Sequence, residues 1–272
     1  MKKFCLIILT VLLVAAVTGC SSDNSETKKE NAAETKTSIK IACAETTQAL
    51  VDAIVPVMAE KGYEVEYQVF DNNVNTLVAT NDGSVDSVFL VHKPFMENFN
   101  NSNEGDLVML EPHVFAVGMG LFSEKHNSIE EFPDGASIGI MNDSMNMDRA
   151  LRIFSDEGLL TLKEGIEKYT LLDIVENPHN FNFIEMDQTQ TVRSLQDLDG
   201  AVAFFSHMKN ADKDFNSYLI RDQHPENYPQ GVIVKAENKD AKWAKDLVEA
   251  FRSEEVRAFS DDYYGGLYEY ID

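Results

Sequence analysis

The sequence predicts an α/β fold with two lobes and a ligand-binding crevice between them. From Ser38 onward, strand-like and helix-like segments alternate, which is typical of a parallel sheet covered by helices. Two such α/β sets follow each other, and the chain then returns to further strands. This order favours two lobes, and ligands of such sheets bind beyond the carboxyl ends of the strands.

The first α/β set supplies most of the first lobe. Its expected strands and helices alternate along the chain, with strands at 39–43, 64–70 and 85–91 and helices at about 46–61 and 74–80. Leu50, Ile54, Val57 and Met58 share one face of the first helix, as an amphipathic helix requires. Two further strands are expected at 107–110 and 115–122.

The second set has the same character and is followed by a return to strands. We expect strands at 136–141, 181–186 and 201–205, helices at about 145–157 and 189–195, later strands at 218–220 and 232–235, and a helix at about 240–251. Trp243, Leu247, Val248 and Phe251 lie on one face of that last helix. The predicted lobes are therefore residues 38–113 plus 206–272 for the first and residues 114–205 for the second.

Residues 1–19 have the form of an export signal that ends at a lipidation site. Lys2 and Lys3 precede a short run of apolar or small residues, which is too short to span a bilayer as a helix. The run ends in Val17-Thr18-Gly19-Cys20, which has the form of a lipobox. We therefore expect Cys20 to become the first residue of the mature protein and to carry the lipid that anchors it to a membrane.

The segment 20–37 is expected to be a disordered tether, because it contains no large apolar residue. Residues 1–19 hold two of the 23 basic residues and none of the 46 acidic ones, so the chain from Cys20 on carries a formal charge of −25. This charge excludes a protein that binds nucleic acid through its phosphates. Neither the histidines nor the cysteines show metal-ligand spacing, so no metal or cofactor is expected.

Three segments directly follow predicted strands and are candidates for the crevice: His92 to Phe95, Asn142 to Arg149, and Ser206 with His207. In the second segment, Asp143 or Ser144 can cap a helix, and free backbone N–H groups near Asn146 would then stand beside the guanidinium of Arg149. Such a pair is a good receptor for a carboxylate. The alternative is that Arg149 pairs with Asp148 or Asp156 on the surface and Asn146 merely caps the helix, while His92 is a packing residue.

At these residues the chain resembles the NlpA-type lipoproteins, the substrate-binding subunits of methionine ABC importers. The shared blocks are His92-Lys93-Pro94, Asn142-Asp143 with Asn146 and Arg149, Gly158-Leu159-Leu160, Leu162-Lys163, Asp173-Ile174 with Glu176-Asn177-Pro178 and Asn180, Arg193-Ser194-Leu195, and Asn238-Lys239-Asp240. The resemblance implies a periplasmic-binding-protein-like fold whose lobes close on an amino acid. It also implies that His92, Asn146 and Arg149 line the pocket and that Arg149 binds the ligand carboxylate.

Four positions depart from the family pattern in the expected pocket. Asn73 stands where the family usually has a tyrosine, Leu90 where it has an aromatic residue, and Ser206 and Gln230 where it has asparagines. We expect all four to contact ligand. Aromatic walls favour a thioether, so their loss makes the pocket less suited to methionine. Methionine is the default ligand, and another amino acid or a short peptide is the competing expectation.

The sequence thus predicts a lipid-anchored solute-binding protein on the extracytoplasmic face of the cell membrane, with an ABC permease and ATPase as partners and no catalytic activity. Substitution of Arg149 by Ala is expected to abolish ligand binding and to leave the fold intact. Two alternatives keep the same fold. One is a sensory or adhesion lipoprotein that works without a transporter, and the other is an exported enzyme that uses Ser206, His207 and His92 as acid–base groups.

Overall fold

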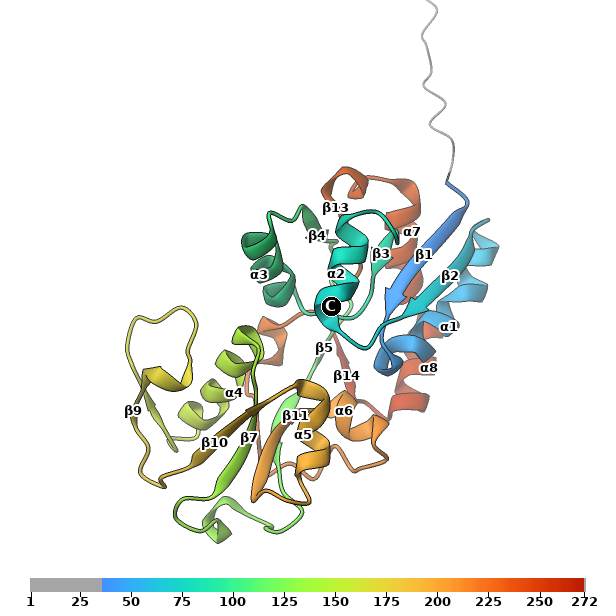
Figure 1. Cartoon of the computed structure of the whole chain (residues 1–272). Helices are drawn as coiled ribbons and strands as arrows, with labels where there is room; N and C mark the ends of the chain where they lie inside the picture. Colours follow the sequence, from blue (N-terminus) through green and yellow to red (C-terminus); the bar gives the residue numbers. More distant parts are fainter. Residues whose placement is uncertain (1–35, 272) are drawn as a thin grey trace, which may run out of the picture. The chain divides into compact units, whose positions relative to one another are not determined.

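The computed structural model describes residues Lys36 to Ile271 (Figure 1). The predicted signal segment, the lipidation site at Cys20 and the tether as far as residue 35 lie outside the described residues. Between Lys36 and Ile271 the chain forms two five-stranded sheets, each with helices packed against it, and each sheet is the centre of one lobe. The expected two-lobed α/β fold is confirmed.

The first lobe is built on a mixed sheet with the strand order β2-β1-β3-β13-β4. Its strands are β1 (Ser38–Cys43), β2 (Glu64–Val69), β3 (Ser87–Val88), β4 (Leu107–Met109) and β13 (Ile233–Lys235). Its helices are α1 (Glu45–Glu60), α2 (Asn73–Asn81), α3 (Lys93–Asn103), α7 (Lys242–Phe251) and α8 (Glu254–Tyr264), with a 3-10 turn at Ala236–Asn238. Strands β2 and β3 pair in parallel with β1, and β13 runs antiparallel to its two neighbours.

The second lobe is built on a sheet with the strand order β10-β7-β11-β6-β12. Its strands are β6 (Met119–Phe122), β7 (Ser137–Met141), β10 (Asn182–Met186), β11 (Gly200–Phe204) and β12 (Ile220–Arg221). Its helices are α4 (Ser144–Asp156), α5 (Gln188–Ser194) and α6 (Phe205–Asn210), with 3-10 turns at Ile129–Glu131, Leu171–Asp173 and Pro225–Asn227. A small antiparallel pair, β8 (Thr161–Leu162) and β9 (Ile174–Glu176), follows α4.

A two-stranded ladder lies where the chain passes between the lobes. Strand β5 (Phe115–Val117) pairs antiparallel with β14 (Tyr268–Tyr270), and both lie between the two sheets in Figure 1. The chain returns to the first sheet between β12 and β13. The sequence placed this return at residue 206, but β12 pairs with β6 in the second sheet, so the return comes after Arg221.

The strand expected over residues 115–122 is divided at Gly118. A Cβ atom at Gly118 would lie only 2.4 Å from the Phe205 ring, and the Gly118 carbonyl accepts a hydrogen bond from the Phe205 N–H. The first residue of α6 therefore makes the backbone hydrogen bond that a neighbouring strand would otherwise make at Gly118. As a result, β5 pairs with β14 while β6 joins the second sheet.

The cores form where the amphipathic patterns predict them. Leu50, Ile54 and Met58 of α1 are fully buried, whereas Val57 is only partly buried. All four expected residues of α7 are buried, and Phe251 stacks on Phe89 with ring centroids 3.6 Å apart. Burial of these side chains is the main source of fold stability.

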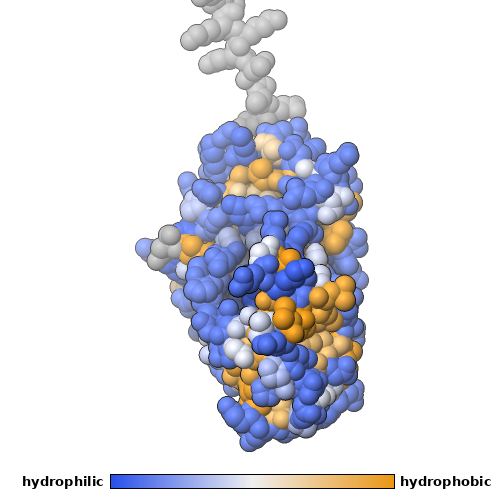
Figure 2. All heavy atoms as spheres, turned by 90° about the vertical axis from the view of Figure 1, so that its left-hand side faces the viewer, coloured by the Kyte–Doolittle hydropathy of each residue, from blue (hydrophilic) through white to orange (hydrophobic). Residues whose placement is uncertain are grey.

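Hydrophilic residues cover most of the face in Figure 2, and hydrophobic residues gather there in separate patches. In the part of the chain from Lys36 to Ile271, we find no helix with the length and hydrophobicity needed to cross a membrane.

Candidate ligand-binding site

A cavity of about 40 Å³ lies between the lobes, with residues of both lobes in its wall. Room of this size holds a few water molecules. Six of the seven predicted ligand-binding residues line it: Asn73, Leu90, His92, Asn146, Ser206 and Gln230. The remaining wall residues are Thr46, Thr47, Val91, Phe95, Val117, Gln188, Phe204, His207 and Tyr268. The structure therefore gathers predicted residues that are up to 157 positions apart in the sequence, from Asn73 to Gln230, around one space.

His92 begins helix α3 and reaches across the crevice. Its Nδ1 accepts a hydrogen bond from the Phe95 N–H at 3.2 Å, so the ring proton resides on Nε2. Nε2 then donates to the side-chain oxygen of Asn146 at 3.1 Å. Burial lowers the pKa of His92 to about 3, and the positive charge of Arg149 adds to the effect. The imidazole is therefore neutral at physiological pH.

Asn146 is held in place by the cap of helix α4. Asp143 accepts from the Asn146 backbone N–H at 2.9 Å and from its side-chain amide at 2.8 Å. The expectation of a free N–H at Asn146 is therefore wrong, because the chain supplies its own carboxylate to this helix N-terminus. Burial raises the pKa of Asp143, and the hydrogen bonds from Asn146 oppose that rise.

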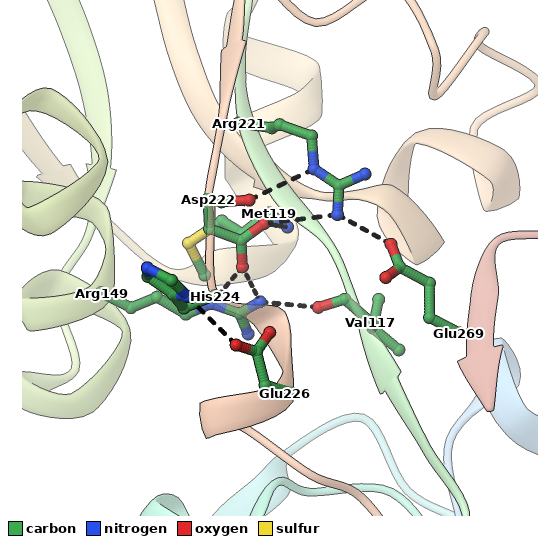
Figure 3. A network of polar contacts seen from close by, with 8 residues as sticks. All are labelled: Val117, Met119, Arg149, Arg221, Asp222, His224, Glu226 and Glu269. Atoms are coloured by element: carbon green, nitrogen blue, oxygen red, sulfur yellow. Dashed lines mark hydrogen bonds and ion pairs between the residues drawn. The ribbon is translucent and has the colours of Figure 1, made fainter. Parts of the chain in front are cut away.

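Arg149 is buried and forms an ion pair with Asp222 (Figure 3). Its Nε donates to Asp222 Oδ2 at 2.9 Å, and its Nη2 contacts the same oxygen and donates to the Val117 carbonyl at 2.7 Å. The alternative that Arg149 pairs on the surface is wrong. Asp148 instead binds Arg152 at 2.9 Å.

The guanidinium of Arg149 lies directly behind the cavity wall. Arg149 is absent from the residues that line the cavity, but it contacts two of them, Val117 and Phe204. Its guanidinium carbon is 5.6 Å from the centre of the Phe204 ring and 4.2 Å from that of Tyr228. Asp222 occupies one edge of the planar group. In this arrangement the predicted carboxylate receptor is satisfied from within the chain.

The sequence did not point to several residues of the site. Asp222 is 73 positions from Arg149, and no local spacing connects the two. Gln188 could have been found, since it comes two residues after the end of β10 and thus satisfies the strand-end rule. Its side-chain oxygen accepts a hydrogen bond from the Asn73 amide at 3.4 Å, which is another contact between the lobes.

A metal centre has no candidate among residues 36–271, where no cluster of three or more His, Cys, Asp or Glu side chains could hold an ion. Cys43 is fully buried in β1, as expected for a core residue, and burial raises the pKa of its thiol to about 12. The cavity wall is largely uncharged, so it can recognise a ligand through hydrogen bonds and shape.

Proteins of known identity share both the sequence pattern and the fold. The chain is 28% identical over 262 residues to the probable D-methionine-binding lipoprotein MetQ of Haemophilus influenzae, covering 94% of each chain. A periplasmic substrate-binding protein of an ABC transporter from Coxiella burnetii has a similar structure, with a TM-score of 0.82 and 25% identity over 86% of this chain and all of that one. A putative lipoprotein from Ruminococcus gnavus also has a TM-score of 0.82, with 26% identity over 87% of this chain and all of that one.

The sequence model of the NlpA lipoprotein family matches residues 39–269. This range includes both lobes and every residue of the cavity wall. The resemblance noted from the sequence is thereby confirmed, and the chain belongs to the NlpA lipoprotein family.

Proposed function

We propose that this protein captures an amino acid or a short peptide in the crevice and delivers it to an ABC permease. The observation that carries the proposal is the cavity whose wall comes from both lobes. A ligand held there contacts both sheets at once, so its binding favours the state in which the lobes are together. Relatives that bind D-methionine or serve ABC transporters support the same function.

The mechanism is capture and release without chemical change. The connections between the lobes, including β5 with β14, act as the hinge, and the lobes separate to admit ligand. The contacts from His92 to Asn146 and from Asn73 to Gln188 then re-form as the lobes close. A difference of a few kcal/mol in ligand affinity between the two states is enough to drive closure.

Arg149 is the proposed anchor for the ligand carboxylate, through the part of the guanidinium that Asp222 does not use. No hydrogen bond from Nη1 occurs within residues 36–271, whereas Nε and Nη2 are both engaged. A carboxylate that binds at Nη1 would share the guanidinium with Asp222. Its charge would then be stabilised in a site of low dielectric constant.

The proposed location is the extracytoplasmic face of a membrane, with a lipid on Cys20. A tether of this kind keeps the binding domain at high local concentration near a permease. Membership in a family of lipoproteins supports the anchor. Methionine remains the default ligand, while Asn73, Leu90, Ser206 and Gln230 give the wall a different chemistry from the usual pattern.

The direct test is mass spectrometry of small molecules released from protein that was purified without unfolding. An amino acid or a short peptide should be recovered in an amount comparable to that of the protein. The matched control is the same preparation of Ser206→Trp, which fills the cavity and should release much less. If no such molecule is recovered, and calorimetry with the twenty amino acids detects no binding, the proposed function is wrong.

A further inference from the structure

One residue of the cavity wall has a buried polar atom without a partner among the described residues. Among residues 36–271, four buried side-chain atoms lack a hydrogen bond: Ser87 Oγ, His113 Nε2, His207 Nδ1 and Tyr270 Oη. Of these four residues, only His207 lines the cavity. A buried nitrogen without a hydrogen bond raises the free energy of the folded protein. A ligand group that pairs with His207 would remove this cost and so strengthen binding.

His207 lies at the outer end of the cavity. A wider groove of about 790 Å³ adjoins it, and five residues line both spaces: Thr46, Asn73, Leu90, Gln188 and His207. By contrast, His92, Asn146, Val117 and Phe204 line the cavity alone, and Arg149 stands behind the last two. A ligand whose carboxylate points towards Arg149 therefore directs its other end towards His207.

The outer end is mostly polar, since four of its five shared residues carry hydrogen-bonding side chains. Burial lowers the pKa of His207, while a hydrogen bond with the Gln188 backbone and the charge of Asp187 oppose that fall. Burial thus favours the neutral imidazole, in which Nδ1 has no partner among residues 36–271. A thioether is only a weak hydrogen-bond acceptor and has no donor, so it makes poor use of these groups.

We propose that His207, together with Asn73 and Gln188, forms a specificity-determining subsite for an amide group at the end of the ligand remote from Arg149. The amide belongs to a side-chain carboxamide or to a peptide bond. This inference rests on the proposed function, because it assigns the chemistry of the solute that the crevice takes. The subsite also accounts for Gln188, which contacts Asn73 from the other lobe, because its carboxamide can pair with an amide of the ligand.

The experiment is a calorimetric titration of the wild-type protein, cleared of any bound ligand, with L-methionine, L-glutamine and L-alanyl-L-alanine. At least one amide probe should bind more tightly than methionine. His207→Leu should weaken that probe by about tenfold, as expected for a lost hydrogen bond, and should leave methionine unchanged or improved. His207→Asn, which keeps a polar atom near the position of Nδ1, should restore most of the loss.

His224→Leu is the matched control, because the His224 side chain is exposed, pairs with Glu226 and does not line the cavity. It should change no affinity, and thermal unfolding of each variant checks that the fold is kept. The inference is overturned if methionine binds at least as tightly as both amide probes, or if His207→Leu leaves the amide affinity unchanged. Methionine binding alone would overturn this inference and keep the proposed function, whereas the absence of binding by all three probes would count against both.

Discussion

Arg149 and Asp222 form a buried ion pair that connects helix α4 to the segment through which the chain returns to the first lobe. Asp222 directly follows β12, and its second carboxylate oxygen accepts from the Met119 N–H at 3.2 Å. On the same side, Arg221 binds Glu269 of β14 at 2.7 Å (Figure 3). The group proposed to sense the ligand carboxylate is thus directly linked to the hinge.

Arg149→Met should lower the free energy of unfolding by about 3–5 kcal/mol, because it leaves the Asp222 carboxylate buried without its cation. Arg149 is therefore expected to stabilise the fold in addition to its proposed role as the carboxylate anchor. Urea unfolding followed by circular dichroism measures the loss. The double variant Arg149→Met/Asp222→Leu should recover most of it, and strictly additive losses would contradict the coupling.

His92 should make the protein less stable in acid. Its pKa is about 3 in the folded state and about 6.5 when unfolded, so the unfolded state binds more protons between these values. The free energy of unfolding therefore falls as the pH drops from about 6.5 towards 3, by at most about 1.4 kcal/mol per pH unit from this group. Unfolding at pH 7 and pH 4.5 should show a smaller loss for His92→Gln than for the wild type. An equal loss in both proteins would mean that another group causes the acid sensitivity.

Tyr63→Phe should reduce stability without changing ligand affinity, because Tyr63 is remote from the cavity wall. Its hydroxyl donates to Asp246 at 2.6 Å in the buried contact with α7, and Lys242 binds the same carboxylate. Loss of the hydroxyl should cost about 1–2 kcal/mol in chemical unfolding. The control Tyr263→Phe, at an exposed residue, should cost less than about 0.5 kcal/mol. A marked change in ligand affinity for Tyr63→Phe would show that this contact influences the crevice.

Cys43 should resist alkylation in the folded protein, because its thiol is buried and its pKa is about 12. Only a very small fraction is thiolate at pH 8, and the thiolate is the reactive form. Mass spectrometry after iodoacetamide treatment should find the Cys43 peptide unmodified in buffer and modified in urea. Rapid modification in buffer would show that β1 opens readily.

The sequence predicted the elements whose signals are local. The apolar faces of α1 and α7 have the helical period, and both faces are buried in the structure. Helix α3 was not expected, because His92-Lys93-Pro94 follows an apolar run that resembles one long strand. In the structure only Ser87–Val88 forms a strand, His92 caps α3, and Pro94 occupies the first turn, where its missing N–H has no cost.

The part of the site that could not be predicted depends on distant contacts. The strand-end rule predicted from the sequence that His92, Asn146 and Ser206 face one crevice, and all three line the cavity. The cap of α4 by Asp143 was expected from the local sequence, but nothing there indicated that Asp222 fills one edge of Arg149. Side-chain pairs of this kind are fixed by packing of the whole domain, because nothing in the local sequence selects one acidic residue among 46.

Ser206→Trp tests whether the crevice between the lobes is the ligand site. Ser206 lines the cavity at the start of α6, so a tryptophan there occupies the space that the ligand needs. Ser102→Trp, at an exposed position of α3, is the matched control. The measurement is a calorimetric titration with the ligand recovered from the native protein. Affinity should fall at least about 100-fold for Ser206→Trp and stay unchanged for Ser102→Trp. Wild-type affinity in a folded Ser206→Trp protein would mean that the ligand binds elsewhere.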